Sequence, residues 1–232
     1  MVNKKKENGD LIDDQLNRLE KQGRIPFIMR MAKTPQRRWQ KRAYPSGVNY
    51  ARPVDPEEMG RYNDPTGRTG ICYTADFAIA AIAESLGRIY QRKPDAFFLG
   101  LEDLQAAHIY SLETTRDTKI IDMVRLQALL HLTADQIMGE DYSITQAVTS
   151  WAVNTPGLDY DGIAYLSRHL GAGTCTAYWI RDGEADPLAD VENWPSDEYI
   201  DTAVENFPQN WTGVDISGFE IVTETLNYSV SG

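Results

Sequence analysis

Arg61 and Glu84 stand in sequence surroundings that are unusual for surface charges. Arg61 belongs to the segment 60–65 (Gly-Arg-Tyr-Asn-Asp-Pro), a cluster of turn-forming residues. Glu84 is surrounded mainly by alanines on a predicted helix. A guanidinium among free backbone amides can bind phosphate oxygens, and a carboxylate that faces a cleft can stabilise positive charge developing on a bound substrate.

The helix that carries Glu84 is predicted for residues 77–90, with Asp76 as its N-cap and a strand at 71–73 before it. Apolar residues recur at helical spacing and predict a core-facing stripe of Ile79, Ile82, Leu86 and Ile89. The opposite side carries Phe77, Ala80, Ala81, Glu84 and Arg88. This composition favours a helix covered on both sides, with Glu84 aimed at a cleft. The alternative is a surface ion pair between Glu84 and Arg88 at i, i+4.

Three segments, in this order, resemble the RES domain family, which is named after an arginine, a glutamate and a serine. The first is Gly60-Arg61-Tyr62-Asn63, followed by Tyr73 and, eleven residues later, by Glu84. The second is 141–147 (Asp-Tyr-Ser-Ile-Thr-Gln-Ala) and the third is 160–169 (Tyr-Asp-Gly-Ile-Ala-Tyr-Leu-Ser-Arg-His). The resemblance covers about residues 40–182.

The resemblance implies a function and a fold. The fold would be α+β, compact and similar to that of the ADP-ribosyltransferase toxins, with two small sheets around an NAD cleft. The protein would be an NAD-degrading toxin-type enzyme that cleaves the nicotinamide–ribose bond by phosphorolysis or hydrolysis, with inorganic phosphate as a possible co-substrate and an antitoxin or immunity protein as partner. Two alternatives stay open, a protein ADP-ribosyltransferase that uses the same cleft and a catalytically silent module that binds NAD or a partner.

The resemblance also assigns residues to this site. The catalytic residues would be Arg61, Glu84 and Ser167. The NAD-binding residues would be Arg42, Arg52, Tyr62, Asn63, Tyr73 and Ser143. Arg42 lies nineteen residues before Arg61 and fits the family's interval, while Arg52 stays open because loop lengths vary. Ser143 and Ser167 are likewise alternatives for the family serine, either of which would bind substrate. Tyr62 or Tyr73 would stack on the nicotinamide.

The charge is divided unevenly along the chain. Residues 1–43 hold 12 basic and 5 acidic residues, whereas the remainder holds 11 basic and 29 acidic residues. An acidic body disfavours nucleic-acid binding, because neutralising phosphates needs a basic surface. An anionic ligand would therefore need locally placed arginines. Four arginines fall together in one loop-rich stretch before residue 70, and they outnumber what one pyrophosphate requires: Arg42, Arg52, Arg61 and Arg68.

Other functional classes find little support in the sequence. No run approaches 18 uncharged apolar residues, so no membrane span is expected. The lysines at 4–6 have no apolar segment behind them, and the two cysteines are too few for a disulfide framework. The three histidines are dispersed and predict no metal site. We expect a cytoplasmic protein.

The predicted organisation has three parts. Residues 1–40 form a basic, partly helical extension with a helix at 10–22 and a basic linker at 33–42; residues 41–182 form the RES-like domain; and residues 183–232 form an acidic extension that packs on it. Strands are predicted at 119–123, 160–166 and 175–180, and helices at 124–132 and 143–153. Residues 182–201 are expected to be irregular and 219–230 to form a strand. Residues 1–32 are expected to be dispensable for folding and activity.

Overall fold

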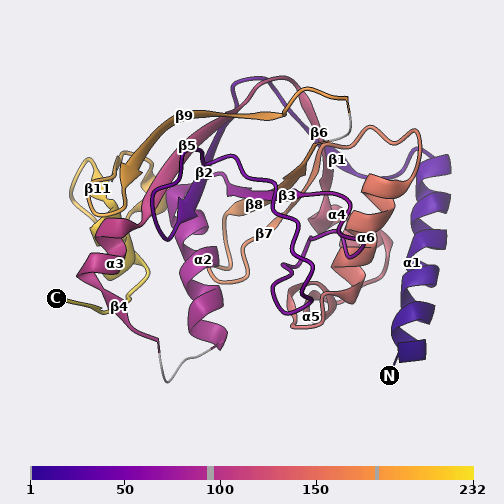
Figure 1. Ribbon diagram of the computed structural model, residues 1–232, viewed down its shortest axis with the longest axis horizontal. Coiled ribbons are helices and arrows are strands. Elements are labelled where there is room, and N and C mark those ends of the chain that lie inside the picture. Colours follow the sequence, from indigo (N-terminus) through magenta and orange to yellow (C-terminus); the bar gives the residue numbers. More distant parts are fainter. Residues whose placement is uncertain (1, 93–96, 181–182) are drawn as a thin grey trace.

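The computed structural model describes residues 2–92, 97–180 and 183–232, and within them one eight-stranded sheet forms the centre of the molecule (Figure 1). Its strands, in spatial order, are β1 (Phe27–Arg30), β6 (Thr118–Asp122), β7 (Gly162–Leu166), β8 (Thr174–Trp179), β3 (Ile71–Ala75), β2 (Pro35–Gln40), β5 (His108–Thr114) and β9 (Leu188–Pro195). Neighbouring strands are antiparallel except β6 and β7, which are parallel. The fold is α+β.

The sheet is continuous, but it is weakly joined between β3 and β2. There the two strands pair only where Arg37 lies opposite Ala75. On its other side β2 pairs with β5 along its whole length, from Pro35 to Gln40. The structure therefore has one large sheet where two small sheets were expected. Its two parts, β1-β6-β7-β8-β3 and β2-β5-β9, diverge at this junction.

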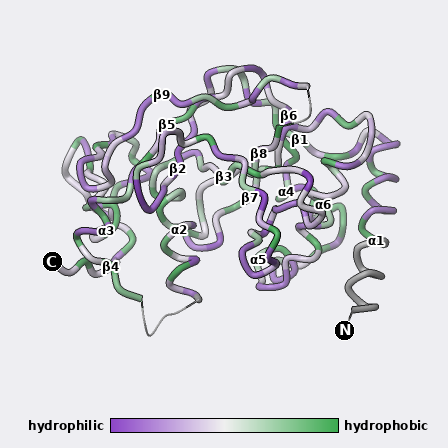
Figure 2. Tube along the Cα trace, viewed as in Figure 1, coloured by the Kyte–Doolittle hydropathy of each residue, from purple (hydrophilic) through white to green (hydrophobic). Residues whose placement is uncertain are grey.

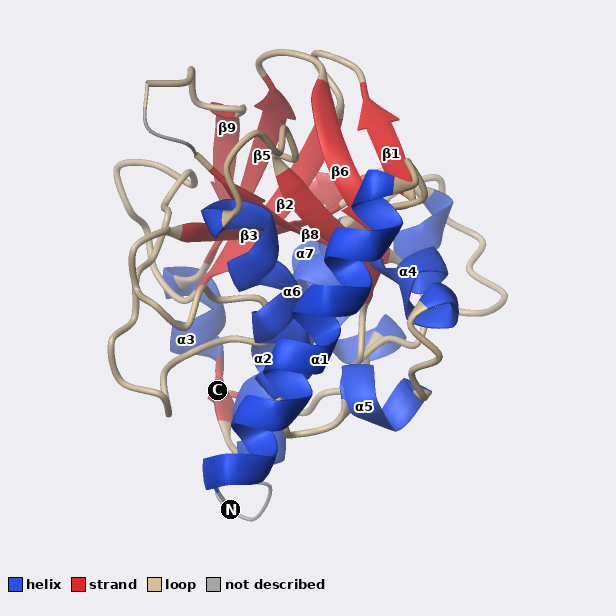
Figure 3. Cartoon of the chain, turned by 90° about the vertical axis from the view of Figure 1, so that its right-hand side faces the viewer, coloured by secondary structure: helices blue, strands red, loops and turns tan. Residues whose placement is uncertain are grey.

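Helices cover one face of the sheet, so that in Figure 3 the strands lie above and most helices below. The helices are α1 (Val2–Lys21), α2 (Ala78–Arg92), α3 (Leu101–Ala106), α4 (Met123–Leu129), α5 (Ala134–Met138), α6 (Ser143–Asn154) and α7 (Gly218–Glu220). None of the helices in the described part of the chain is both long and apolar enough to cross a bilayer.

Helix α2 confirms the helix predicted around Glu84. Its apolar stripe is buried through Ile79, Ile82 and Leu86, but Ile89 is exposed. On the opposite side Ala80 and Ala81 are buried too, so the helix is covered on both sides, as predicted. Figure 2 colours much of α2 green, for hydrophobic residues. The predicted N-cap is wrong: the helix begins at Ala78, two residues after Asp76.

Asp76 has another role, because its carboxylate pairs with Arg30 of β1 at 2.7 Å. The same oxygen, Oδ1, accepts a hydrogen bond from Gln36 of β2. These contacts tie the end of β3 to both parts of the sheet.

The N-terminal segment belongs to the same core as the rest of the chain. Leu16 and Leu19 of α1 are buried in the main apolar cluster, and α1 packs against α6. The Trp151 indole N–H donates to Asn17 Oδ1 at 3.0 Å, and the Tyr160 hydroxyl donates to Glu20 Oε2 at 2.8 Å. Strands β1 and β2 belong to the central sheet. The predicted basic linker at 33–42 is therefore wrong.

The C-terminal segment also contributes to the sheet. Strand β9 pairs with β5 within a segment that was expected to be irregular, of which Asp182 lies outside the described residues. It is an edge strand, mostly exposed, and Figure 2 colours much of it purple, for hydrophilic residues. Shorter elements follow or pair nearby: β4 (Leu99–Gly100), β10 (Ile200–Asp201), a 3₁₀ turn (Val204–Asn206), β11 (Ile216–Ser217), a π-helical turn (Ile221–Thr225) and β12 (Val230–Ser231).

The strand predicted at 219–230 is wrong over most of its length, because helix α7 and the π-helical turn occupy residues 218–225. A capping box explains the difference. The Ser217 hydroxyl accepts from the Glu220 backbone N–H, and the Glu220 carboxylate accepts from the Ser217 N–H. Ser-x-x-Glu is a helix-start signal that the alternation of apolar residues obscured.

Candidate active site

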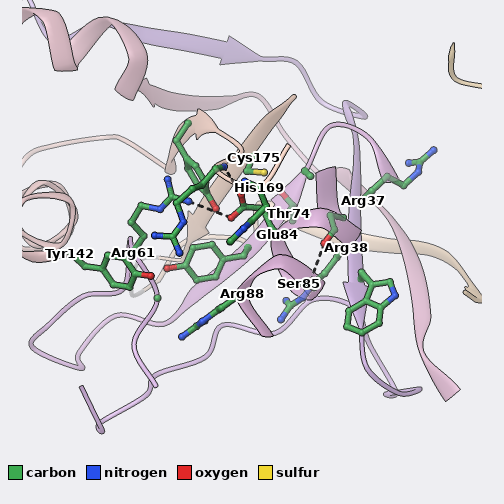
Figure 4. Close-up of a pocket in the computed structure, with 17 residues that line it drawn as sticks. Arg37, Arg38, Arg61, Thr74, Glu84, Ser85, Arg88, Tyr142, His169 and Cys175 are labelled. Atoms are coloured by element: carbon green, nitrogen blue, oxygen red, sulfur yellow. Dashed lines mark hydrogen bonds and ion pairs between the residues drawn. The ribbon is translucent and has the colours of Figure 1, made fainter. Parts of the chain in front are cut away.

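A cavity of about 230 Å³ lies where the two parts of the sheet diverge, with α2 along one side (Figure 4). Its lining includes residues of β2 and β3. The charged and aromatic residues that line it include Arg61, Tyr73, Glu84, Arg88, Tyr142, Tyr165, Arg168 and His169. Arg37 of β2 also lines the cavity, but Figure 4 shows its guanidinium pointing away from Glu84.

The Glu84 carboxylate is held by a turn that follows β7. Its Oε1 accepts hydrogen bonds from the Ser167 hydroxyl at 2.8 Å, the Arg168 backbone N–H at 2.7 Å and the His169 backbone N–H at 3.4 Å. Its Oε2 contacts only Arg61 Nη2 among the described residues, at 3.4 Å. One oxygen is thus fixed by the protein, while the other is only loosely engaged at the cavity. Glu84 does not pair with Arg88, so the alternative of a surface ion pair is wrong.

Arg61 is buried, with 7% of its side chain exposed, and its Nη1 has no hydrogen-bond partner. Its guanidinium carbon lies 5.1 Å from the Tyr165 ring centroid and 5.9 Å from that of Tyr62. Burial lowers the pKa of Arg61, but Tyr165, Tyr62 and Glu84 raise it by a larger amount, so the group stays charged. A buried, charged donor without a partner is expensive to maintain, and its presence beside a cavity indicates an anionic ligand.

The turn that carries Arg61 is fixed by its own neighbours. Asn63 Oδ1 accepts from the Gly60 N–H at 2.6 Å and from the Tyr73 hydroxyl at 3.1 Å, and that hydroxyl accepts from the Tyr62 N–H at 3.0 Å. A side chain at Gly60 would come within 2.7 Å of the Tyr73 oxygen. Asn63 is buried and does not line the cavity, so it shapes the turn, whereas Tyr73 both shapes the turn and lines the cavity.

The aromatic wall differs in part from the one expected. Tyr62 is fully buried, stacks on Tyr165 at 4.4 Å between centroids, and lies outside the cavity lining. Tyr73, Tyr142 and Tyr165 line the cavity. Burial raises the pKa of Tyr73 and of Tyr165, so both hydroxyls stay protonated at neutral pH.

The structure does not bring the predicted upstream arginines to the cavity. Arg42 and Arg52 are both exposed and line no part of it. Arg42 instead donates to the Tyr44 hydroxyl at 3.0 Å. These two residues lie on the chain between β2 and β3, which runs over the surface at this point.

Four arginines other than Arg61 line the cavity, Arg37 and Arg38 of β2 and, on the side of Glu84, Arg88 and Arg168. Arg88 donates to the carbonyls of Glu58 and Met59, and Arg168 donates to those of Met138 and Gly139. Arg168 keeps its Nε buried without a partner. The sequence did not lead us to predict Arg88 or Arg168 as substrate-binding residues. Arg168 stood inside the third family-like segment, and Arg88 was one helical turn from Glu84, so a signal was present for each.

The two candidate serines have different environments. Ser167 is fully buried, donates to Glu84 and accepts from the Leu170 backbone N–H at 3.2 Å. Ser143 is the first residue of α6 and lies outside the cavity lining. Neither hydroxyl reaches the cavity as a substrate contact; Ser167 positions the carboxylate. Among the described residues, no group of three or more His, Cys, Asp or Glu side chains is arranged to hold a metal ion.

Comparison with known proteins identifies a structural relative. No family model matches the chain, and no curated protein matches it. A chain of the M. tuberculosis MbcT–MbcA toxin–antitoxin complex aligns with a TM-score of 0.52 and 18% sequence identity, over 84% of this chain and 91% of that chain. The two chains share a fold. The predicted α+β class is thereby confirmed, while membership of the RES family stays a prediction.

Proposed function

We propose that the protein is an NAD-degrading enzyme that cleaves the nicotinamide–ribose bond at the Glu84 cavity, and that it acts as the toxin of a toxin–antitoxin pair. The arrangement of Glu84 and Arg61 carries this proposal. One carboxylate oxygen is fixed by three donors and the other faces the cavity, beside a buried guanidinium that has a free N–H group. Such a pair suits a substrate with an anionic part and a reacting carbon that becomes positive.

The reaction would use these groups in different ways. Loss of nicotinamide leaves positive charge on the ribose, which the negative charge of Glu84 stabilises without reorganisation, because the turn at 167–169 already holds it. Arg61 would bind a pyrophosphate oxygen through Nη1. Tyr73, Tyr142 and Tyr165 offer ring faces for the nicotinamide or the adenine.

Phosphorolysis is the favoured form of the reaction, because the cavity collects more positive charge than one pyrophosphate needs. Arg61, Arg88 and Arg168 line it together with the single carboxylate of Glu84, in a protein whose net charge is −11. The additional positive charge that the sequence assigns to Arg42, Arg52 and Arg68 comes instead from Arg88 and Arg168. Inorganic phosphate would attack the ribose and give ADP-ribose-1″-phosphate.

Nicotinamide release from NAD tests this proposal, measured with and without millimolar phosphate and followed by mass spectrometry of the product. We expect phosphate to raise the rate and to appear in the product. Free ADP-ribose would show hydrolysis, and a labelled protein band would show protein ADP-ribosylation. No release under any condition would overturn the enzymatic proposal and leave a module that binds NAD or a partner.

The toxin role draws its support from the fold shared with a chain of a toxin–antitoxin complex. If the chain degrades cytoplasmic NAD, its expression in a bacterial host should lower the NAD pool and stop growth. The Glu84→Gln variant, expressed at the same level, should do neither. If the two proteins are equally toxic, growth arrest does not depend on the proposed chemistry. Co-expression with the neighbouring gene product would test for an antitoxin.

A further inference from the structure

His169 lies in the cavity, yet the chemistry described above gives it no role. Its ring lines the cavity next to Glu84, as Figure 4 shows. Its backbone N–H is part of the turn that holds Glu84 Oε1. Within the described residues neither ring nitrogen has a hydrogen-bond partner, although the ring is half-buried. The two ring nitrogens are therefore left for water or for a molecule bound in the cavity.

Helix α2 makes room for this ring. A Cβ added to Gly87 would lie 2.4 Å from His169 Cγ and 2.5 Å from its Nδ1. The ring edge that carries Nδ1 therefore lies against bare backbone, one helical turn from Glu84. Any larger residue at 87 would displace the ring. This close approach leaves Nε2 as the nitrogen farther from the helix.

We propose that His169 is the general base of the reaction, taking the proton from the acceptor that attacks the ribose. This inference rests on the proposed function and adds a second catalytic group to it. Glu84 cannot serve both purposes well, because the negative charge that stabilises the ribose cation would be lost if it took up the proton.

The proton-transfer step balances without another reactant. An oxygen of water or of hydrogenphosphate bonds to the anomeric carbon of the ribose as the bond from that carbon to the nicotinamide nitrogen breaks. The electron pair of the broken bond leaves with neutral nicotinamide. The acceptor's proton passes to the imidazole, which becomes imidazolium and then returns the proton to solvent.

The charged surroundings of the ring keep it ready to accept a proton. Burial lowers the pKa of His169, Glu84 raises it, and Arg168 and Arg61 lower it again, so that the net pKa lies below the ordinary value. Tyr73, Tyr165 and Cys175 also line the cavity, and burial raises the pKa of each, so they stay neutral near pH 7. His169 is therefore neutral at that pH and can act as a base.

The test compares initial rates of nicotinamide release by the wild-type chain and by His169→Gln from pH 5 to pH 9, at saturating NAD. For the wild type we expect activity to rise with pH through an acid limb below the ordinary histidine pKa. For His169→Gln we expect kcat at pH 7.5 to fall by ~10²-fold or more, the scale of general base catalysis, with little change in KM and without that limb. His108→Gln, on β5 and outside the cavity lining, is the matched control and should keep both rate and profile.

Two further results complete the test. In His169→Ala, added imidazole should restore part of the rate. This variant only removes atoms, so it also replaces His169→Gln if the glutamine variant does not fold. The wild type can be active while His169→Gln keeps its rate and pH profile, or while imidazole fails to rescue His169→Ala. Either result overturns the role of His169 and leaves the proposed function standing. A wild type that releases no nicotinamide overturns both.

Discussion

Within the part of the chain that the structure describes, two buried arginines pair with carboxylates and serve different purposes. Arg30 pairs with Asp76 at 2.7 Å, and Arg61 pairs with Glu84 at 3.4 Å. The two arginines are almost equally buried, with 9% and 7% of their side chains exposed. The first pair joins β1 to the end of β3 and lies outside the cavity lining, whereas the second faces the cavity.

The difference lies in how the hydrogen-bonding groups around each pair are used. Arg30 also donates to the Thr176 hydroxyl, and Asp76 also accepts from Gln36, so protein groups engage both terminal nitrogens of Arg30. The Nε of Arg30 is buried without a partner too, but Arg30 does not line the cavity. Arg61 lines the cavity and keeps a whole NH₂ group, Nη1, buried and unpartnered, and the longer contact leaves Glu84 Oε2 available. An ion pair alone therefore does not mark a site. Unused donors and acceptors that converge on a cavity do.

Removing residues 1–32 should have the largest effect, because it deletes Arg30 together with α1. The deletion exposes the apolar face of α6 that Leu16 and Leu19 cover, and it leaves Asp76 without its cation. Contrary to the expectation from sequence, we now expect no cooperatively folded protein. Circular dichroism melting of the purified fragment measures this, and a cooperative transition close to that of the full chain would contradict it.

Breaking the structural pair alone should destabilise the fold and spare the chemistry. Arg30→Met keeps most of the aliphatic stem but leaves the Asp76 carboxylate largely buried without its partner, so we expect a loss of about 3 kcal/mol in the free energy of unfolding. The double variant Arg30→Met/Asp76→Asn should recover part of that loss. Urea unfolding gives these values, and kcat of the folded protein should change less than twofold. A large fall in kcat would mean that both pairs serve the reaction.

Breaking the Arg61–Glu84 pair should impair the chemistry and spare the fold. Glu84→Gln keeps the size of the side chain but removes the charge, and we expect nicotinamide release to fall by ~10²-fold or more. The free energy of unfolding should stay within about 1 kcal/mol of the wild type, since Glu84 is partly exposed and a glutamine oxygen can still accept from the turn at 167–169. Undiminished turnover of NAD by Glu84→Gln would show that the reaction does not depend on the Glu84 carboxylate.

Removing the Ser167 hydroxyl should have the smallest effect of the series. Ser167→Ala takes one of three donors from Glu84 Oε1, and the backbone N–H groups of Arg168 and His169 remain. A lost hydrogen bond to a charged group amounts to about 1.5 kcal/mol, or roughly a tenfold fall in kcat. Ser143→Ala is the matched control and should leave kcat unchanged. A fall as large as that of Glu84→Gln would give the Ser167 hydroxyl a direct part in the reaction.

Local patterns explain what could be predicted from the sequence. The strand before α2, the helix itself and the orientation of Glu84 all follow from the order of apolar, small and charged residues within about twenty positions. The burial of α2 on both sides could be predicted because Ala80 and Ala81 occupy positions where a solvated helix would carry charged residues. The nearness of Ser167 to Glu84 could be expected only from the family resemblance, because β7 and α2 meet through the sheet.

Long-range pairing explains what could not be predicted. Residues 33–42 were taken for a solvated linker because of their charge, but Arg37 and Arg38 lie on a central strand where polar partners satisfy both. Arg38 donates to the carbonyls of Gly47 and Asn49, and Arg37 donates to the Tyr199 hydroxyl. These partners lie on the loop after β2 and on the segment between β9 and β10, whereas β2 itself is placed by its pairing with β5. No local pattern encodes that arrangement. The exposure of Arg42 and Arg52 follows from the same strand, since the chain leaves the sheet after Gln40.

A crystal structure of the Glu84→Gln variant with NAD, in which turnover is slow enough for the substrate to persist, tests the central claim most directly. We expect a pyrophosphate oxygen within hydrogen-bonding distance of Arg61 Nη1, the ribose of the nicotinamide half against residue 84, and neither Arg42 nor Arg52 in contact with the substrate. NAD bound elsewhere on the molecule, or bound with Arg61 Nη1 still unpartnered, would contradict the assignment of this cavity as the site of NAD cleavage.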